Sequence, residues 1–569
     1  MKKTLLATLA MVLALGTLGA RAETPKAAPA DPHEWWRHAV FYEIYPRSYA
    51  DSNDDGIGDL NGITSKLDYI KTLGVDAIWI APCFPSPQVD FGYDVSDYEQ
   101  IDPMYGTLAD FDRLVAEGQK RGIRVIMDFV VNHTSDQHRW FVESKSSKTS
   151  PKRDWFIWRD GKGEGQPPNN WVSTFGSPAW KLDPTTGQWY YHYFYPEQPD
   201  LNWRNPEVEK AMLDETRYWY KRGVSGFRLD AVDTLYEDPV LKDNPILPGT
   251  DNFGRPNQNE IYDKKLPEVH DALKKLRKAA DEYGGVLVGE TWTRSIDELK
   301  AYYGNGDEVQ LPMNFLFTEV NKLSAPGFRA RIAEVEGAGV WPVYVIGNHD
   351  IVRAWDRYGD GVHNDAIAKV MASLYLTLRG TAIMYYGEEL GMENNTPTRR
   401  EDVKDPIGQL GWPKEKGRDG ERTPMQWDTS ANAGFSKAKP WLPVPANAAT
   451  KNVDGLTKDP ASILNLYRKL TALRRSNAAL HEGEYVPLAE NDANVLAYMR
   501  RTKDDAVLVA LNMSAEAQTL HPGLAAKGVK STTAKALIAT HRAAGSSVGL
   551  DAIALKPFEV VIAEVAPGR

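Results

Sequence analysis

Eight short apolar runs, most of them separated by amphipathic helical patterns, constrain the fold of this chain more than any other feature. The runs cover residues 40–44, 77–80, 125–130, 226–229, 286–289, 311–315, 343–346 and 383–386, and helical patterns between them cover residues 62–73, 108–121, 206–222, 266–283 and 365–378. Strands that alternate with helices form a parallel sheet, so the pattern predicts an α/β fold with a closed (β/α)8 TIM barrel. An open doubly wound sheet is the alternative, but no Gly-rich dinucleotide fingerprint follows any run.

Two further segments depart from the barrel pattern. Residues 134–201 are rich in aromatic residues, Pro and Gly, which predicts a subdomain inserted after the third strand. The barrel would then comprise residues 36–133 and 202–476, with a second long excursion over residues 387–460. From residue 477 to 569 strand-like runs follow one another without helices, which predicts a C-terminal antiparallel β-sandwich domain.

The first residues are not expected to belong to this fold. Lys2 and Lys3 precede an apolar run over residues 5–18, and the small residues Ala20 and Ala22 suit a signal peptidase. We therefore predict a signal peptide over residues 1–22 and a linker over residues 23–35. An uncleaved anchor is the alternative, although the run is short for a membrane span. The prediction is an exported protein, periplasmic or secreted, without stable membrane association after signal removal.

Charge and cysteine content exclude some classes of protein. The formal net charge of −10 argues against nucleic acid as a partner. Cys83 is the only cysteine, so no disulfide can form within the chain. We expect a monomer or a weak homodimer that binds a small molecule.

Polar side chains follow the expected strands at the end where such barrels carry their active sites. They are Asp90 and Tyr93, Asp128 to His133, Arg228 and Asp230, Glu290, and His349 and Asp350. Hydrolysis of a glycosidic bond needs two carboxyl groups, one to attack the anomeric carbon and one to give a proton to the leaving oxygen. The collected carboxylates therefore favour a glycosidase.

Individual roles follow from position. Asp230 would be the nucleophile. Arg228 lies two residues before it, on the same side of the strand, and would keep its carboxylate ionised. Glu290 would be the acid, held protonated by nearby negative charge, while His133 and His349 could bind sugar hydroxyls and Tyr93 could stack on the sugar. A structural Arg–Asp ion pair and a metal site are the alternatives, the latter disfavoured because the histidines lack helical spacing.

The motifs that contain these residues resemble the α-amylase family of glycoside hydrolases, family 13, and within it the oligo-1,6-glucosidase/α-glucosidase branch. They are GYDVSDY at 92–98, DFVVNH at 128–133, QPDLN at 198–202, GFRLD at 226–230, GE at 289–290, GNHD at 347–350 and RTPMQW at 422–427. The match covers nearly the whole chain after the predicted signal peptide.

The resemblance implies a retaining mechanism with Asp230 as nucleophile, Glu290 as general acid/base and Asp350 as transition-state stabiliser. It also implies a glucose pocket formed by Asp90, Tyr93, His133, Phe175, Phe194, Arg228, His349 and Arg422. A pair between Asp90 and Arg422 would close the far end of this pocket and impose exo action. Ala231 follows the nucleophile, and a small residue there resembles enzymes that accept α-1,4 bonds, whereas valine resembles those that favour α-1,6 bonds.

One acidic loop is a candidate metal site. Asp51, Asn53, Asp55, the carbonyl of Ile57, and Asp59 offer oxygen ligands at every second residue, which suits a hard cation. Gly62 stands where an EF-hand loop needs a glutamate, and a solvated acidic turn is the alternative reading. Because the family resemblance also implies a cation here, we predict structural Ca²⁺, with Mg²⁺ as the second choice, and no organic cofactor.

The resulting hypothesis is an exo-acting retaining α-glucosidase that releases terminal glucose from short α-glucosides. We expect maltose and malto-oligosaccharides as favoured substrates, α-1,4 over α-1,6 bonds, and some transglucosylation. The alternatives are an oligo-1,6-glucosidase, a sucrose- or maltose-rearranging isomerase or transferase, and a catalytically inert glycosidase-like partner protein.

Overall fold

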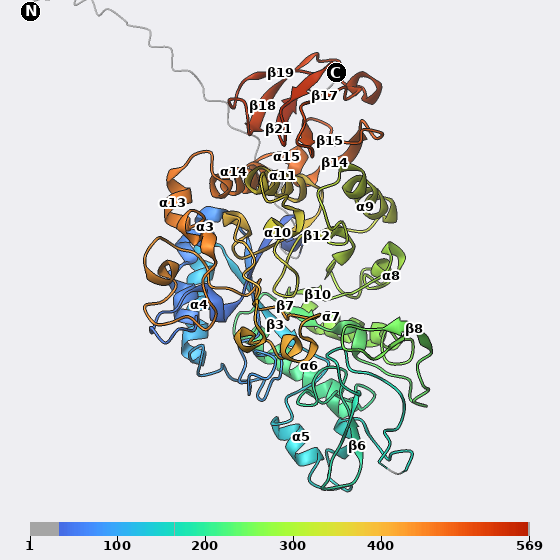
Figure 1. Cartoon of the computed structure of the whole chain (residues 1–569). Coiled ribbons are helices and arrows are strands. Elements are labelled where there is room, and N and C mark those ends of the chain that lie inside the picture. Colours follow the sequence, from blue (N-terminus) through green and yellow to red (C-terminus); the bar gives the residue numbers. More distant parts are fainter. Residues whose placement is uncertain (1–33, 164, 567–569) are drawn as a thin grey trace, which may run out of the picture.

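The computed structural model describes residues 34–163 and 165–566, and a barrel of eight parallel strands lies between the inserted and C-terminal segments (Figure 1). Its strands are β1 (Val40–Ile44), β2 (Ala77–Ile80), β3 (Arg124–Val130), β7 (Gly226–Asp230), β10 (Val286–Gly289), β11 (Leu311–Pro312), β12 (Val343–Val345) and β13 (Thr381–Tyr385). The predicted signal peptide and all but the last two residues of the predicted linker lie outside the described residues.

The barrel is nearly closed. Its strand order is β11-β10-β7-β3-β2-β1-β13-β12, so β11 and β12 lie at the two ends of the hydrogen-bonded sheet. β11 is only two residues long and ends on Pro312, which has no N–H to donate to a neighbouring strand. The (β/α)8 architecture is therefore confirmed, with one joint that lacks ladder hydrogen bonds.

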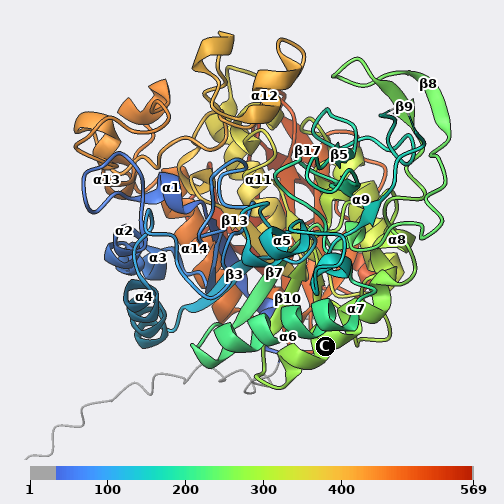
Figure 2. The same cartoon turned by 90° about the horizontal axis from the view of Figure 1, so that it is seen from below.

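Helices surround the strands, as Figure 2 shows from the side of the inserted subdomain. They are α2 (Leu60–Ser65), α3 (Leu67–Leu73), α4 (Leu108–Arg121), α6 (Pro206–Lys221), α7 (Val269–Asp281), α8 (Ile296–Ala301), α9 (Ala325–Ala338), α10 (Ala354–Tyr358), α11 (Asn364–Thr377) and α14 (Ile463–Ser476). The helix predicted over residues 62–73 is interrupted at Lys66, whose φ of −104° and ψ of 6° are not helical.

The register of neighbouring strands gathers the polar strand ends at one mouth. Asp128 on β3 lies beside Arg228 on β7, and Val130 lies beside Asp230. β7 also approaches β10 closely, because a Cβ at Gly226 would lie 2.3 Å from the carbonyl oxygen of Val286. Glycine at this position lets the central strands pack at their observed distance.

The segment after β3 forms the predicted inserted subdomain. It contains α5 (Arg139–Ser144) and a three-stranded antiparallel sheet of β4 (Trp158–Arg159), β5 (Trp180–Leu182) and β6 (Trp189–Tyr191). Buried aromatic side chains, among them Trp171, Trp180 and Tyr191, form its small core. A hairpin of β8 (Ile246–Thr250) and β9 (Pro256–Gln258) contacts this subdomain: Gln258 Nε2 donates to the Asn170 carbonyl at 2.7 Å.

The C-terminal domain lies at the opposite end of the barrel from the inserted subdomain (Figure 1). Its six-stranded antiparallel sheet contains β14 (Glu484–Leu488), β15 (Val495–Arg501), β16 (Ala506–Asn512), β18 (Thr533–Ala539), β19 (Ser547–Gly549) and β21 (Val560–Val565), and β17 (Gln518–Leu520) pairs with β20 (Ile553–Leu555). Arg500 Nη1 donates to the Thr377 carbonyl at 2.8 Å and fixes the domain to α11.

Short elements complete the described chain. They are α1 (Pro46–Tyr49), α12 (Pro406–Gly411), α13 (Val453–Lys458), α15 (Ala478–Glu482) and the 3-10 helices η1 (Trp35–His38), η2 (Arg153–Trp155), η3 (Val232–Thr234), η4 (Phe315–Phe317), η5 (Glu388–Leu390), η6 (Arg400–Asp402), η7 (Ala431–Gly434), η8 (Ala446–Ala449) and η9 (Leu524–Lys527). Across the described residues, no helix combines the length and the apolar character needed to span a bilayer.

Candidate active site

A cavity of about 320 Å³ opens at the carboxyl ends of the barrel strands. It is lined by nine residues that the sequence singled out, namely Asp90, Tyr93, His133, Phe175, Phe194, Asp230, Ala231, Glu290 and Asp350. Thr174, Tyr193, Asp233, Thr234, Lys264, Trp292 and Arg418 complete the lining. Three other predicted residues, Arg228, His349 and Arg422, lie behind this wall and are at most 1% exposed.

One guanidinium group holds three carboxylates at the end of β7. Arg228 Nη1 lies 2.5 Å from Asp230 Oδ1 and 3.0 Å from Asp128 Oδ1, and Nη2 lies 2.8 Å from Glu290 Oε2. Arg228 and Asp230 project to the same side of the strand because they are two residues apart. The structure thus brings the predicted nucleophile and the predicted acid to a single cation.

Protonation of this cluster differs from the sequence prediction. Arg228 lowers the pKa of Asp230, as expected, but burial outweighs it and the pKa lies well above its usual value. Burial likewise raises the pKa of Asp128 to about 6. Because burial outweighs the charge of Arg228 at both residues, Asp230 and Asp128 retain their protons more readily than isolated carboxylic acids do.

Glu290 follows β10 and is held at both oxygens. Oε2 accepts from the Ala231 N–H at 2.9 Å, and Oε1 accepts from Trp292 Nε1–H at 2.8 Å. The Ala231 N–H is available because this residue adopts the left-handed conformation, with φ 48° and ψ 42°. A left-handed conformation is uncommon for a residue other than glycine and marks local backbone strain beside the predicted nucleophile.

Asp350 lies at one end of a buried series of polar contacts that was not predicted from the sequence. His349 Nε2 lies 2.6 Å from the Tyr93 hydroxyl and 3.2 Å from Asp350 Oδ2, while Nδ1 lies 2.6 Å from Glu43 Oε1. Burial raises the pKa of Glu43 and lowers that of His349. A charged residue within the otherwise apolar run 40–44 was the available signal for Glu43.

The charge on Asp350 is stabilised from several sides. Burial alone would raise its pKa, but His349, Arg418, Arg422 and Arg228 together hold the pKa below its usual range. Arg422 Nη2 and Arg418 Nη1 lie 2.8 and 3.1 Å from Asp350 Oδ1. Asp350 therefore stays ionised at the cavity wall.

The predicted pair between Asp90 and Arg422 is wrong. Asp90 Oδ1 instead pairs with Arg418 Nη2 at 2.9 Å, and Arg418 Nε also pairs with Asp405 Oδ2 at 2.7 Å. Arg422 points to Asp350 and to the His349 carbonyl. The pairing partner of Asp90 is thus an arginine four residues earlier in the same irregular segment, and both residues of this pair line the cavity.

The inserted subdomain supplies the remaining wall. Gln198 Nε2 lies 3.0 Å from His133 Nε2 and 3.3 Å from Asp90 Oδ2, so the QPDLN segment connects two predicted sugar-binding residues. The ring centroid of Phe194 lies 5.0 Å from that of His133, and the ring centroid of Phe175 lies 5.5 Å from that of Phe194. Burial lowers the pKa of His133 to about 3, so this histidine is neutral.

The predicted metal loop lies on the surface between α1 and α2. Asp51 Oδ2 accepts from the Gly56 N–H at 2.8 Å, Asn53 Oδ1 accepts from Asp55 N–H, and Asp55 Oδ1 accepts from Ile57 N–H. Asp59 caps α2 through the Gly62 N–H. The oxygen donors fit a hard cation in kind, but the three carboxylates are not gathered into one tight group, so an ion would have to draw them together.

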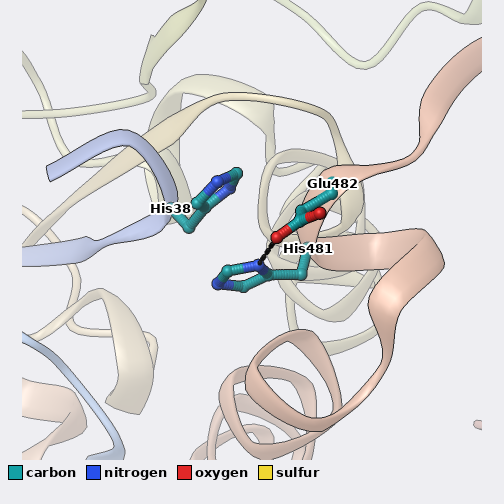
Figure 3. A group of neighbouring side chains, drawn as sticks. All are labelled: His38, His481 and Glu482. Atoms are coloured by element: carbon teal, nitrogen blue, oxygen red, sulfur yellow. Dashed lines mark ion pairs between the residues drawn. The ribbon is translucent and has the colours of Figure 1, made fainter. Parts of the chain in front are cut away.

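Within the described residues, the group of three possible metal ligands that does lie close together is His38, His481 and Glu482 (Figure 3). The two imidazole rings stack with centroids 3.9 Å apart and planes inclined by 28°. A metal binds imidazole along a lone pair in the ring plane, about 2.0–2.1 Å from the nitrogen. Stacked rings direct these lone pairs side by side, so we assign the group a packing role between η1 and α15.

Comparison with known proteins adds independent findings. A family model described as "Alpha amylase, catalytic domain" matches residues 43–483. A probable alpha-glucosidase of Rhizobium meliloti is 44% identical over 520 residues, which cover 87% of this chain and 92% of that protein. An oligo-1,6-glucosidase of Parageobacillus thermoglucosidasius is 39% identical over 516 residues, covering 84% of this chain and 90% of the relative.

A solved structure is similar over almost the whole chain. An isomaltulose synthase mutant from Erwinia rhapontici NX5, in complex with its natural substrate sucrose, has a TM-score of 0.86 at 36% identity. The similarity covers 94% of this chain and 99% of that chain.

Proposed function

Because the chain belongs to the α-amylase family of glycoside hydrolases, within its α-glucosidase/oligo-1,6-glucosidase branch, we propose that it is an exo-acting retaining α-glucosidase. It releases terminal glucose from short α-glucosides, with maltose and malto-oligosaccharides favoured. Its relatives are α-glucosidase-type glycoside hydrolases.

The observation that carries this proposal is the shape and charge of the cavity. A volume of about 320 Å³ is at the small end of ligand pockets, which typically measure about 300–1,000 Å³. The Asp90–Arg418 pair on its wall would close the far end, and Asp230 and Glu290 also line the cavity. A closed pocket of this size supports the binding of one terminal sugar and excludes cleavage within a long chain.

The proposed reaction has two steps. The ionised form of Asp230 reacts: one of its oxygens bonds to the anomeric carbon as the glycosidic bond breaks, and the leaving oxygen takes the electron pair of that bond and a proton from Glu290. Glu290 then takes a proton from water, whose oxygen bonds to the anomeric carbon and displaces Asp230. Retaining enzymes place the two carboxyl groups about 5–5.5 Å apart, and the shared Arg228 guanidinium supports such closeness.

Asp350 would stabilise the cationic sugar of the transition state. Its pKa lies below the usual range, so it carries a negative charge throughout the working pH range. Asp90 and Arg418 at the closed end, together with His133 and Tyr93, would bind the hydroxyl groups of the terminal glucose.

A preference for α-1,4 bonds is proposed from Ala231. This residue lines the cavity beside Glu290, where the second sugar would enter. A larger side chain would narrow that entrance, and one or two methyl groups in such a position discriminate substrates by about 1–3 kcal/mol.

A second candidate function is a sucrose-rearranging isomerase or transferase. The similarity to the isomaltulose synthase structure favours it, since the same covalent intermediate could pass to a sugar instead of water. The first proposal includes some transglucosylation, because its covalent intermediate could also pass to a sugar.

Export and a structural cation complete the proposal. The N-terminal pattern supports removal of residues 1–22, and Edman sequencing of the mature protein should begin at Glu23. Asp51, Asn53, Asp55, Ile57 through its carbonyl, and Asp59 would hold Ca²⁺ or Mg²⁺, which would crosslink the loop before α2.

Product analysis tests the function. Maltose, isomaltose, sucrose and trehalose are each incubated with the protein, and the products are separated by chromatography and followed by NMR. We expect glucose released first as the α-anomer, fastest from maltose. Rearranged disaccharides as the main products would favour the second candidate, and no glucose from any of the four would refute the first.

A further inference from the structure

Part of the cavity wall is not used by the proposed glucose pocket. Asp233, Thr234 and Lys264 follow β7 and Trp292 follows β10, whereas Asp90 follows β2 and Arg418 follows β13, so the barrel order places the two groups on different sides of the cavity. A leaving group must occupy the side of Trp292, because the terminal glucose fills the closed end. Trp292 is the large aromatic residue of the group, and 43% of its surface is exposed.

The indole of Trp292 is built as a rigid platform. It stacks on Phe315 with ring centroids 4.0 Å apart and planes inclined by 6°. Phe315 follows β11 and is 3% exposed, so it supports one face of the indole from the barrel wall. Since Trp292 lines the cavity and is partly exposed, the face opposite Phe315 is the one that can receive a ring, to which it offers a large apolar area.

The indole N–H is directed at the predicted acid. Trp292 Nε1–H donates to Glu290 Oε1 at 2.8 Å. The other oxygen, Oε2, accepts from the Ala231 N–H at 2.9 Å and lies 2.8 Å from Arg228 Nη2. Because Oε2 accepts a backbone N–H and lies beside the Arg228 cation, the proton of the acid form is better placed on Oε1.

We propose that Trp292 binds the leaving group and positions the acid: its free face carries the ring that departs, and its N–H holds the Glu290 oxygen that gives up the proton. This inference rests on the proposed glycosidase function. Trp292 is a specificity residue towards the leaving group and a positioning residue towards Glu290.

The positioning role of Trp292 follows from the movement of the proton when the glycosidic bond breaks. As the glycosidic bond breaks, its electron pair goes to the leaving oxygen, which takes the proton from Glu290 Oε1. Negative charge then develops on Oε1, and the Trp292 N–H stabilises it. Hydrogen bonds to charged groups contribute about 1.5–3 kcal/mol, which corresponds to a loss of about 10- to 100-fold in rate when the donor is removed.

Three substrates separate the two roles. Maltose presents a leaving ring and needs a proton. 4-Nitrophenyl α-glucoside presents a ring but leaves as a stable phenolate, and α-glucosyl fluoride presents neither a ring nor a leaving oxygen of high basicity. The kcat/KM of each substrate reports the first, bond-breaking step.

Two variants at the same position remove the roles in turn. Trp292→Phe keeps a flat face and loses the N–H, so we expect kcat/KM to fall about 10- to 100-fold for maltose while the other two substrates change little. Trp292→Leu also loses the face, so KM should rise several-fold for maltose and for the nitrophenyl glucoside, with the fluoride nearly unchanged.

Trp341→Phe is the matched control. Trp341 Nε1–H donates to Thr381 Oγ1 at 3.0 Å at the amino end of the strands, so the variant loses a comparable hydrogen bond away from the cavity. It should leave all three substrates unchanged. Equal losses for all three substrates in Trp292→Phe, or no loss for maltose, would overturn the inference. Failure of the unmodified protein to cleave any of the three would instead count against the proposed function.

Discussion

Arg418 Nη2 donates to Asp90 Oδ1 at 2.9 Å, joining the loop after β2 to the long excursion after β13. The same guanidinium reaches Asp350 Oδ1 at 3.1 Å and Asp405 Oδ2 at 2.7 Å. One arginine thus connects Asp90 to Asp350, the proposed transition-state stabiliser. The exo action proposed for the protein depends on this connection.

Asp405→Asn should weaken that connection without touching the substrate. Asp405 is fully buried and accepts from both the side chain and the backbone N–H of Arg418. Loss of its charge removes charge-assisted hydrogen bonds, so kcat/KM for maltose should fall about 10- to 100-fold. Steady-state kinetics checks this. Asp402→Asn, at an exposed aspartate of the same excursion, is the control and should match the unmodified protein.

Asp230→Asn should abolish turnover and leave the fold intact. The amide keeps the size of the carboxylate but cannot form a covalent glucosyl ester, so activity on maltose should drop at least ~10³-fold, about 4 kcal/mol of barrier. Circular dichroism and thermal unfolding check the fold. Substantial remaining activity would refute the assignment of the nucleophile.

Ala231→Val should change the linkage preference. The substitution adds two methyl groups at the entrance beside Glu290, at a residue with φ 48°. We expect the ratio of kcat/KM for maltose over isomaltose to fall about 10- to 200-fold, which is the range for methyl-sized discrimination. An unchanged ratio, whatever the absolute rates, would show that Ala231 does not determine the linkage.

Removal of the proposed cation should lower thermal stability. A ligand that binds only the folded state adds about 2.7 kcal/mol at 100 times its Kd, so Tm should rise with added Ca²⁺ and fall in chelator. Asp51→Ala should lose this response. Asp54→Ala should keep it, since Asp54 is not among the predicted ligands and pairs with Lys437. Identical Ca²⁺ responses in the two variants would speak against the site.

His138 should make the inserted subdomain sensitive to acid. Burial, followed by Arg139 and Lys152, lowers its pKa in the folded protein to about 3, whereas an unfolded imidazole has a pKa of about 6.5. The unfolded state therefore binds the proton more strongly between these values. The contribution of His138 to the free energy of unfolding is therefore complete above pH 6.5 and declines as the pH falls towards 3.

His138→Asn tests this pH dependence. His138 Nδ1 caps α5 by accepting from the Trp140 N–H at 3.1 Å, and asparagine can also cap a helix without titrating. Titration of His138 should make the free energy of unfolding about 2 kcal/mol lower at pH 5 than at pH 8. The Tm of the variant relative to the unmodified protein should therefore rise as the pH drops from 8 to 5. A constant difference would contradict the prediction.

The local features of the barrel were predictable from the sequence. β1, β2 and β10 begin and end at the predicted residues, because strands buried on both faces are nearly continuous apolar runs, with Glu43 as the one charged residue in these three strands. In the C-terminal domain, β17, β19 and β20 were missed because three residues give no periodicity to detect, and β18 was missed because two of its three buried residues are alanines, which are depleted in strands. The break at Lys66 was missed because the apolar pattern continues through it.

The sequence by itself determined the architecture, the inserted and C-terminal segments, and the carboxylates at the strand ends, because these depend on burial patterns and on residues adjacent along the chain. Only the tertiary structure decided that Arg418, and not Arg422, pairs with Asp90. It alone placed Glu43 behind His349 and Trp292 against Glu290. Such contacts depend on the paths of irregular segments and on side-chain directions across several strands, and no periodic pattern in a single sequence records them.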